Sequence, residues 1–438
     1  MELNKLLNKT FHCQCGSTHN VPIQEIIYAP DAIECMPDVL ARYVKGRRIV
    51  LLCDVRTLSV AGKSAGQALE SAGWDIDVII LPDTDTGGPV CDDITYNQLK
   101  SKISPPDIAL AIGCGVINDL TKWLAFEQNI PYAVLATAAT MNGFTSANIA
   151  PSIAGVKVIL AARAPLAVFA IPSIIADAPF ELTTAGLGDV IAKPVSTADW
   201  MMNHIFNGEH FCRTCSEMIN SLEPSYTEHP ENIQQRRPSA LEALINALFY
   251  SGIAMTIIGT SAPASGGEHL LSHTLDMLSS VDGCEHDLHG RQVGVGTIVA
   301  SALYEKIFQI KTPKCVSFPP EIDAAFWGKL QDSVNLQYEQ KKPLLQSMLG
   351  KLNDESVWNK FIEKSRPLVR PAGQIKDCLK TAGAAYTFAD IKCSRERIRK
   401  VILHMHEIRK RPTVVDMAWL LGILPNAVDE IIDNWLTS

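Results

Sequence analysis

Two motifs decide the fold of this chain: S-G-G-E-H-L-L-S-H at residues 265–273 and H-D-L-H-G-R-Q-V-G at 286–294. On a helix, His269 and His273 are four residues apart, so their imidazoles project from one face and can converge on one point. His289 follows beside Gly290, where the missing side chain leaves space for a metal or a substrate. Histidine pairs at this spacing are also common as hydrogen-bonded core pairs, so the spacing alone leaves both interpretations open.

A metal ion that is held by histidines for catalysis usually takes a third protein donor and keeps one position open. The motif A-G-L-G-D-V-I-A-K at 185–193 supplies a carboxylate, Asp189, in a run that is typical of a helix. Two histidines and an aspartate around an open position suit zinc, iron or nickel acting as a Lewis acid. The three motifs together therefore predict a catalytic metal centre.

The length and composition set the broad class of the protein. A chain of 438 residues is too long for one small domain and predicts two or three units, and 47% hydrophobic with 20% charged residues is an ordinary globular composition. The net charge of −8 argues against a nucleic acid or an anionic membrane as a partner. An uncharged run at 243–264 is long enough to span a bilayer, but its polar residues, glycines and proline favour a buried central helix over stable membrane insertion.

The twelve cysteines are scattered without regular spacing, which favours a reducing compartment and predicts a cytoplasmic protein. Two clusters stand out in the sequence, Cys13 and Cys15 with His19, and Cys212 with Cys215. Neither has a second cysteine pair at the spacing of a structural zinc site, so we do not expect a zinc ribbon.

Short apolar runs alternate with helical patterns in the first half of the chain. A strand-turn-strand unit is expected at 11–28, and further strands are expected at 48–54, 78–82, 107–115 and 132–137. Alternating strands and helices predict a parallel α/β sheet that is covered on both faces and binds ligands at the carboxyl ends of its strands.

The ends of these strands carry residues that suit a dinucleotide. Asp54 closes one strand, where a carboxylate can accept hydrogen bonds from a ribose. Gly113 and Gly115 close another strand and open a helix, so that bare backbone N–H groups can bind a pyrophosphate. Two glycines after a strand also form a plain tight turn, and that alternative stays open. Three residues with hydroxyl groups, Thr137, Thr140 and Ser146, lie at or after the end of the next strand. An isolated cluster of hydroxyls at such a place usually marks only a turn.

Five ordered motifs resemble sn-glycerol-1-phosphate dehydrogenase, which belongs to the superfamily of iron-containing alcohol dehydrogenases, glycerol dehydrogenase and dehydroquinate synthase. They are G-C-G-V-I-N-D-L-T-K, A-T-A-A-T-M-N-G-F-T-S, A-G-L-G-D-V-I-A-K, S-G-G-E-H-L-L-S-H and H-G-R-Q-V-G. With the late H-E-I-R-K-R-P-T-V-V-D-M-A, the resemblance covers nearly the whole chain. It implies an α/β dinucleotide-binding domain at 1–178 and an all-helical metal- and substrate-binding domain at 179–438, with the active site in the cleft between them.

The resemblance also implies the roles of individual residues. Metal ligation falls to Asp189, His269 and His289, and catalysis and substrate contact fall to Asp189, His273 and Asn142. The metal is one divalent ion, zinc, nickel or iron. The cofactor is NAD or NADP, and the residues implied to bind it are Asp54, Gly113, Cys114, Gly115, Val116, Ile117, Thr137, Ala138, Ala139, Thr140 and Ser146.

The chain departs from the family pattern at two places. Where the family usually has P-T-A-P-S-M-D-G, residues 136–143 are A-T-A-A-T-M-N-G, so both prolines are absent and the substrate-contacting aspartate is Asn142. Asparagine keeps the shape and one acceptor but loses the charge. Pro194 is expected to bend the helix that carries Asp189, because proline removes a backbone hydrogen bond.

The expected reaction is the NAD(P)-dependent reduction of dihydroxyacetone phosphate to sn-glycerol 1-phosphate, a step of phospholipid metabolism. Lys157, Lys193 and Arg291 are candidates to hold the substrate phosphate. The alternatives are a related polyol or ketone dehydrogenase, a dehydroquinate-synthase-like cyclase on the same fold, and a non-catalytic nucleotide or metabolite sensor. The expected partner is a small phosphorylated or polyol substrate, and a homo-oligomer is an open alternative to a monomer.

Overall fold

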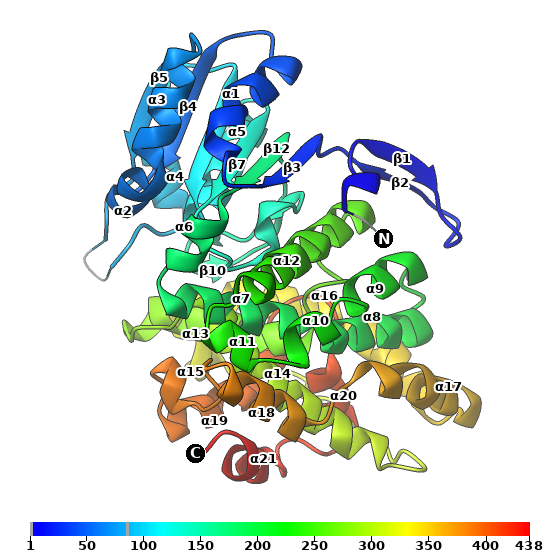
Figure 1. Ribbon diagram of the computed structural model, residues 1–438. Coiled ribbons are helices and arrows are strands. Elements are labelled where there is room, and N and C mark those ends of the chain that lie inside the picture. The colour runs from blue at the N-terminus through cyan, green and yellow to red at the C-terminus, as the bar shows by residue number, and fades with distance from the viewer. Residues whose placement is uncertain (1–2, 85–86) are drawn as a thin grey trace. The chain divides into compact units, whose positions relative to one another are not determined.

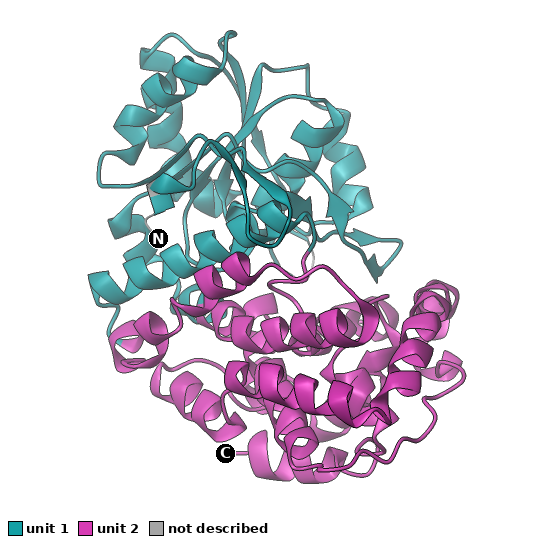
Figure 2. Cartoon of the chain, turned by 90° about the vertical axis from the view of Figure 1, so that its right-hand side faces the viewer, with its two compact units in different colours: residues 1–186, 235–260 teal, residues 187–234, 261–438 magenta. Residues whose placement is uncertain are grey.

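A computed structural model describes residues 3–84 and 87–438 of the chain. The chain divides into two compact units (Figure 2), residues 1–186 with 235–260, and residues 187–234 with 261–438. Unit 1 is built around a parallel sheet and unit 2 is helical (Figure 1).

Six parallel strands form the main sheet of unit 1, in the order β3-β12-β7-β6-β4-β5. All residues of β6 and β7 are buried, as expected for central strands of a sheet covered on both faces. In the order of the sheet, the strands are β3 (Glu25–Tyr28), β12 (Ala167–Ala170), β7 (Tyr132–Ala136), β6 (Ile108–Gly113), β4 (Arg48–Cys53) and β5 (Asp75–Ile80).

Strands β4, β6 and β7 lie within two residues of the expected ranges, and β5 begins three residues before its expected start. The segment 11–28 holds more than a strand-turn-strand unit. Strands β1 (Lys9–His12) and β2 (Thr18–Val21) form a separate antiparallel hairpin, while β3 pairs with β12 in the main sheet. The sequence pattern does not predict β12, because a strand of four residues is too short to show a period.

The helices of unit 1 pack against this sheet and against one another. Short two-stranded pairs made by β8 (Asn148–Ile149) with β11 (Leu160–Ala161) and β9 (Ser152–Ile153) with β10 (Val156–Lys157) follow β7 in the chain. The helices are α1 (Ala32–Tyr43), α2 (Val55–Thr57), α3 (Lys63–Ser71), α4 (Asp93–Lys100), α5 (Gly115–Glu127), α6 (Pro172–Asp177) and α12 (Pro238–Ile258).

Helix α12 contains residues 243–258 of the uncharged run and is a buried helix, as the sequence predicts, whereas residues 259–264 of the run lie beyond its end. It packs against β2, α6 and the short 3-10 helix η3 (Asn142–Phe144) within unit 1. Among the described residues, α12 alone is long and apolar enough to cross a membrane, and 72% of its most apolar window is buried inside the protein. Its contacts are those of a core helix.

Unit 2 consists of helices that follow α7 (Phe180–Ile191). They are α8 (Lys193–Asn207), α9 (Arg213–Asn220), α10 (Pro224–Thr227), α11 (Glu231–Gln234), α13 (Gly267–Asp282), α14 (His289–Phe308), α15 (Ala324–Trp327), α16 (Gln331–Leu352), α17 (Glu355–Ser365), α18 (Ala372–Thr381), α19 (Arg395–His404), α20 (Val414–Leu420) and α21 (Val428–Trp435).

The division of the chain differs from the expected boundary between residues 178 and 179. The compact units divide after residue 186, and α12 joins unit 1 because it packs against β2, α6 and η3. A boundary drawn on sequence alone treats each domain as one continuous segment, whereas here the chain returns to unit 1 for one helix.

The expectation that Pro194 bends the helix of Asp189 is wrong. That helix, α7, ends at Ile191, and Pro194 lies in the first turn of the next helix, α8. The first turn tolerates proline because its N–H groups have no partner within the helix. Pro194 therefore lies at the start of α8 and outside α7.

Candidate functional site

Helices α7, α13 and α14 approach one another at glycines that belong to unit 2. A Cβ atom on Gly188 of α7 would lie 2.0 Å from the carbonyl oxygen of Gly290 on α14. A Cβ atom on Gly296 of α14 would lie 2.2 Å from the carbonyl oxygen of Glu268 on α13. Only glycine allows backbones this close. The neighbours of these contact points in the sequence are Asp189, His269 and His289.

These three side chains converge. Their ligand atoms lie within 4.8 Å of one another, with Oδ1 of Asp189 3.6 Å from Nε2 of His269. The ring centroids of His269 and His289 are 5.2 Å apart. Asp189 and His269 are buried and His289 is half-buried. A carboxylate and two imidazoles at this separation fit a divalent first-row metal ion.

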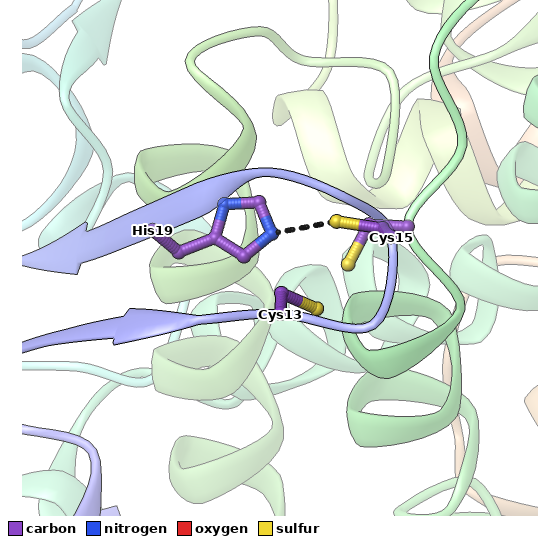
Figure 3. Close-up of side chains that lie close together, drawn as sticks. Cys13, Cys15 and His19 are labelled. Atoms are coloured by element: carbon purple, nitrogen blue, oxygen red, sulfur yellow. Dashed lines mark hydrogen bonds between the residues drawn. The ribbon is translucent and has the colours of Figure 1, made fainter.

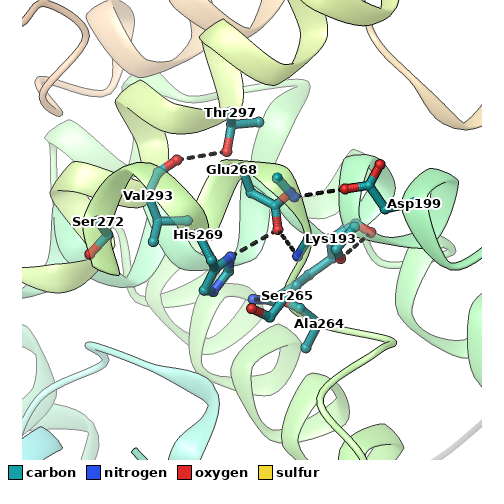
Figure 4. A network of polar contacts seen from close by, with 12 residues as sticks. Lys193, Asp199, Ala264, Ser265, Glu268, His269, Ser272, Val293 and Thr297 are labelled. Atoms are coloured by element: carbon teal, nitrogen blue, oxygen red, sulfur yellow. Dashed lines mark hydrogen bonds and ion pairs between the residues drawn. The ribbon is translucent and has the colours of Figure 1, made fainter. Parts of the chain in front are cut away.

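A hydrogen bond holds each of the two histidines at its Nδ1 atom. Nδ1 of His269 lies 2.8 Å from Oε1 of the fully buried Glu268 (Figure 4), and Nδ1 of His289 lies 2.9 Å from Oγ of Ser272. A carboxylate beside Nδ1 makes that nitrogen the donor, so Nε2 carries the lone pair that a metal requires. The residues around the donor set therefore favour the tautomer that binds a metal at His269.

Asp189 also forms a buried ion pair. Nζ of Lys193 lies 2.7 Å from Oδ1 of Asp189, and the two side chains are 1% and 2% exposed. Lys193 donates a second hydrogen bond to the carbonyl oxygen of Ala264 at 3.0 Å. Although burial opposes ionisation, Lys193, His269 and His289 lower the pKa of Asp189, so its carboxylate stays charged.

A further buried carboxylate, Asp199 on α8, supports the start of α13. It accepts hydrogen bonds from the backbone N–H of Gly267 at 2.7 Å and from the hydroxyl of Tyr304 at 2.5 Å. Burial and the neighbouring Glu268 raise the pKa of Asp199 to about 7. A Cβ atom on Gly266 would lie 2.5 Å from Asp199 and 2.9 Å from Glu268, which explains the glycine at this position of the motif.

His273 lies one turn after His269 on α13 and is buried beside the donor set. Its ring centroid is 6.0 Å from that of His269 and 5.7 Å from that of His289. It is not one of the three residues whose ligand atoms converge within 4.8 Å. Its position suits proton exchange with a molecule bound at the donor set.

The candidate dinucleotide site lies in unit 1, where the strand order reverses between β4 and β6. Open parallel sheets bind ligands outside the carboxyl ends of their strands at such a point. Gly113 ends β6 and Gly115 begins α5, with φ angles of 155° and 31°. A Cβ atom on Gly115 would meet nothing within 4 Å, so the start of α5 is open to a pyrophosphate.

The other predicted residues of this loop belong to the start of the same helix. Cys114 is the N-cap residue of α5, and burial raises the pKa of its thiol to about 11. Val116 and Ile117 lie in the first turn, and a Cβ atom on Gly113 would lie 2.7 Å from Cδ1 of Ile117. The thiol therefore stays protonated and neutral next to the anion site.

Asp54 lies at the end of β4 but is already engaged. Its Oδ1 accepts a hydrogen bond from the backbone N–H of Thr57 at 2.7 Å, and its Oδ2 lies 2.7 Å from Nη2 of Arg56. Although burial opposes it, the hydrogen bonds from Thr57 and Arg56 lower the pKa of Asp54. Arg56 also pairs with Asp83 and is 54% exposed. A cation therefore stands beside the carboxylate expected to meet the ribose.

The predicted segment 137–140 follows β7 and is buried. The N–H of Thr137 donates to the carbonyl oxygen of Gly113 at 3.4 Å, which joins this segment to the glycine loop. The remaining predicted residues of the segment are Ala138, Ala139 and Thr140.

Lys122 on α5 organises the loop that follows. This buried lysine donates to the carbonyl oxygens of Gly143 at 2.7 Å and Asn148 at 2.9 Å, and to Oγ of Ser146 at 3.2 Å. Burial lowers the pKa of Lys122 to about 8. Asn142, at the start of η3, donates from Nδ2 to Oγ of Ser251 on α12 at 3.1 Å.

Two candidates for a phosphate ligand are already paired in the structure. Lys193 is bonded to Asp189, and Arg291 donates to both carboxylate oxygens of Asp287, at 3.0 and 3.1 Å. Lys157 is half-buried on β10 of unit 1.

The sequence predicts no role for three supporting residues, Glu268, Ser272 and Lys122. Only the position of Glu268 beside His269 gives a signal, because a buried acid next to a histidine usually orients it. The partners of Lys122 lie 21 to 26 residues away, and no spacing rule reaches that far.

Comparison with known proteins places the chain among oxidoreductases. The family model for iron-containing alcohol dehydrogenase matches residues 27–179. The chain is 30% identical to a glycerol-1-phosphate dehydrogenase [NAD(P)+] of Halalkalibacterium halodurans over 92% of this chain and 94% of that one. It is 26% identical to the Bacillus subtilis enzyme of the same name, over 93% and 94%. A probable glycerol dehydrogenase of Sinorhizobium meliloti shares the fold, with a TM-score of 0.60 at 16% identity over 94% of this chain and 95% of that one.

Proposed function

Since this chain belongs to the glycerol-1-phosphate dehydrogenases of the iron-containing alcohol dehydrogenase family, we propose that it interconverts dihydroxyacetone phosphate and sn-glycerol 1-phosphate with NAD(P)H or NAD(P)+. The observation that carries this proposal is the convergence of Asp189, His269 and His289 within 4.8 Å. Relatives that bear this enzyme name match more than nine-tenths of the chain.

Asp189, His269 and His289 would hold one divalent metal, zinc, nickel or iron. Such an ion acts as a Lewis acid that polarises a carbonyl group. Glu268 and Ser272 keep the two imidazoles in place, and Lys193 balances the charge of Asp189. A preorganised donor set of this kind needs little rearrangement when the ion binds.

Reduction of the ketone adds a hydride to its carbonyl carbon and a proton to its oxygen. His273, buried beside the donor set, would donate that proton and regain one from solvent. Asn142 would contact the substrate through its side-chain amide. The Gly113–Ile117 loop and the segment 137–140 would hold the dinucleotide that supplies the hydride.

Arg56 supports the use of both nicotinamide cofactors. A lone Asp54 would accept a ribose and repel a 2′-phosphate, whereas the half-exposed guanidinium of Arg56, which pairs with both Asp54 and Asp83, weakens that repulsion. We expect Arg56→Ala to raise the KM for NADPH several-fold more than the KM for NADH. Equal effects on both cofactors would remove Arg56 from this role. Because NAD(P)H is supplied there, the cytoplasm is the compartment that fits the reaction.

The proposal is tested by NADH and NADPH oxidation on protein that has been stripped of metal and reloaded with Zn²⁺, Ni²⁺ or Fe²⁺. Dihydroxyacetone phosphate should be reduced by the loaded protein and not by the stripped one. His289→Ala should lose one equivalent of metal and all turnover while its circular dichroism spectrum stays unchanged, because a catalytic site is not required for folding. Full metal content and activity in His289→Ala would overturn the proposed donor set.

The same assay separates the alternatives. Faster turnover of unphosphorylated ketones would indicate a polyol dehydrogenase, and turnover without net change in NADH would indicate a cyclase. Nucleotide binding without turnover of any substrate would indicate a sensor.

A further inference from the structure

The β1–β2 hairpin brings three metal-binding side chains together at its turn (Figure 3). The N–H of Cys13 donates to the carbonyl oxygen of Ser17 at 2.9 Å, and the N–H of Gly16 donates back to Cys13 at 3.0 Å. Gly16, with φ of 86°, allows this tight reversal. The turn therefore places Cys13 and Cys15 beside His19 at the start of the returning strand.

The separations of the ligand atoms suit one small ion. Sγ of Cys15 lies 3.2 Å from Nε2 of His19, and the ligand atoms of Cys13, Cys15 and His19 all lie within 4.8 Å of one another. Zinc bonds of about 2.3 Å to sulfur and about 2.0 Å to nitrogen place tetrahedral ligands roughly 3.5 to 3.8 Å apart. Small rotations of the side chains would bring all three atoms to that spacing.

Packing within the hairpin holds one of the three side chains, His19, in place. His19 is 4% exposed, lies opposite Phe11 in the hairpin register, and contacts the Phe11 ring edge-on at 5.7 Å between centroids. Strand β2 packs against α12 of unit 1. The imidazole is therefore held on a fixed strand, while the two cysteines lie on the adjoining turn.

A cross-link at the turn would also stabilise the hairpin. It is a separate two-stranded sheet that does not extend the six-stranded sheet, and β1 is mostly exposed. A two-stranded hairpin alone is marginally stable in water. Metal binding to its turn would add binding free energy directly to the folded form.

We propose that Cys13, Cys15 and His19 form a structural site for a thiophilic divalent ion such as Zn²⁺, separate from the centre at Asp189. Two sulfurs and one imidazole nitrogen are donors that zinc prefers in structural sites. On binding, each thiol loses its proton to solvent and its sulfur forms a bond to the ion. The fourth position is completed by water or by another donor. The absence of a second cysteine pair in the sequence argues against a zinc ribbon, and this site needs none.

Cobalt spectroscopy on the whole, reduced protein tests this site. Co²⁺ bound to thiolates gives a charge-transfer band in the near ultraviolet, and the donor set of Asp189, His269 and His289 contains no sulfur. We expect the band in the cobalt-loaded wild-type protein and in His289→Ala, and we expect its loss in the Cys13→Ser/Cys15→Ser double variant. Cys284→Ser, at an exposed cysteine, is the matched control and should keep the band.

The site is refuted if the wild-type protein gives no thiolate band, or if the band persists in the double variant. Hydrogen exchange gives a second readout that needs no cysteine variant. In the His289→Ala background, Zn²⁺ should slow exchange at residues 9–21 at least several-fold relative to the stripped protein, and equal exchange would contradict the proposal. Neither readout depends on turnover, so this site and the proposed function can fail independently.

Discussion

At the scale of single residues, Asn142 most clearly separates this chain from the family pattern. Its Nδ2 donates to Oγ of Ser251 at 3.1 Å, so the amide takes part in fixing η3 against α12. An aspartate could keep that contact, because the serine hydroxyl can donate instead of accept. The loop should therefore tolerate the charge that the family usually has there.

We predict that Asn142→Asp raises turnover of dihydroxyacetone phosphate several-fold with little change in NADH affinity. A charged hydrogen bond exceeds a neutral one by on the order of 1 kcal/mol. Steady-state kinetics and calorimetry of NADH binding provide the two measurements. Lower turnover in the variant would mean that Asn142 is adapted to a different ligand, and the substrate assignment would then give way to another ketone or to the sensor.

Lys122 predicts a pH dependence of stability. Burial lowers its pKa from 10.5 to about 8, so between these values the unfolded chain binds the proton that the folded chain has released. Stability contributed by this residue must therefore rise with pH across that window, by on the order of 3 kcal/mol in total.

Denaturant unfolding of wild-type protein and Lys122→Met at several pH values measures this effect. The difference between the two isolates Lys122 from the cysteines and tyrosines that titrate in the same range. The free energy of unfolding of the wild-type protein should increase relative to the variant from pH 8 to 10.5. A flat difference would show that Lys122 is charged in the fold up to its ordinary pKa.

At the scale of helices, the metal donors depend on close crossings at glycine. A Cβ atom on Gly188 would lie 2.0 Å from a backbone oxygen on α14, so Gly188→Ala must push α7 from α14. We expect a loss of roughly 1 to 3 kcal/mol in stability and a weaker metal centre. Gly350→Ala is the control, because a Cβ atom there meets nothing within 4 Å and alanine favours the helix by about 1 kcal/mol. Unchanged metal affinity in Gly188→Ala would show that the metal site does not depend on the close crossing of α7 and α14.

The start of α5 allows a similar test for the dinucleotide. Gly115→Val places a branched side chain in the open space at the helix N-terminus, and we expect NADH affinity to fall at least tenfold while metal content stays the same. Gly73→Val controls for strain, since Gly73 also has positive φ and open surroundings after α3. Equal NADH affinity of wild-type protein and Gly115→Val, measured by calorimetry, would show that the loop is a plain turn that does not bind the dinucleotide.

At the scale of the whole molecule, the features that depend on local sequence patterns could be predicted, whereas most of those that depend on contacts between distant residues could not. Periodicity within a single element predicts the i, i+4 histidines, the strand ends and a buried helix over much of 243–264. Each of these features is present in the structure. The pairing of Lys193 with Asp189 is also local, at i, i+4, whereas the pairing of Arg56 with Asp83 and the return of α12 to unit 1 depend on tertiary packing. Sequence spacing does not reveal contacts between segments that are far apart in the chain, because such partners meet only after the chain has folded.

The product of dihydroxyacetone phosphate reduction tests the central claim most directly. Metal-loaded protein should convert this ketone with NADH or NADPH to glycerol phosphate that is oxidised only by an enzyme specific for the sn-1 form, and Asp189→Ala should give no product. Formation of sn-glycerol 3-phosphate, or undiminished product from Asp189→Ala, would contradict the account.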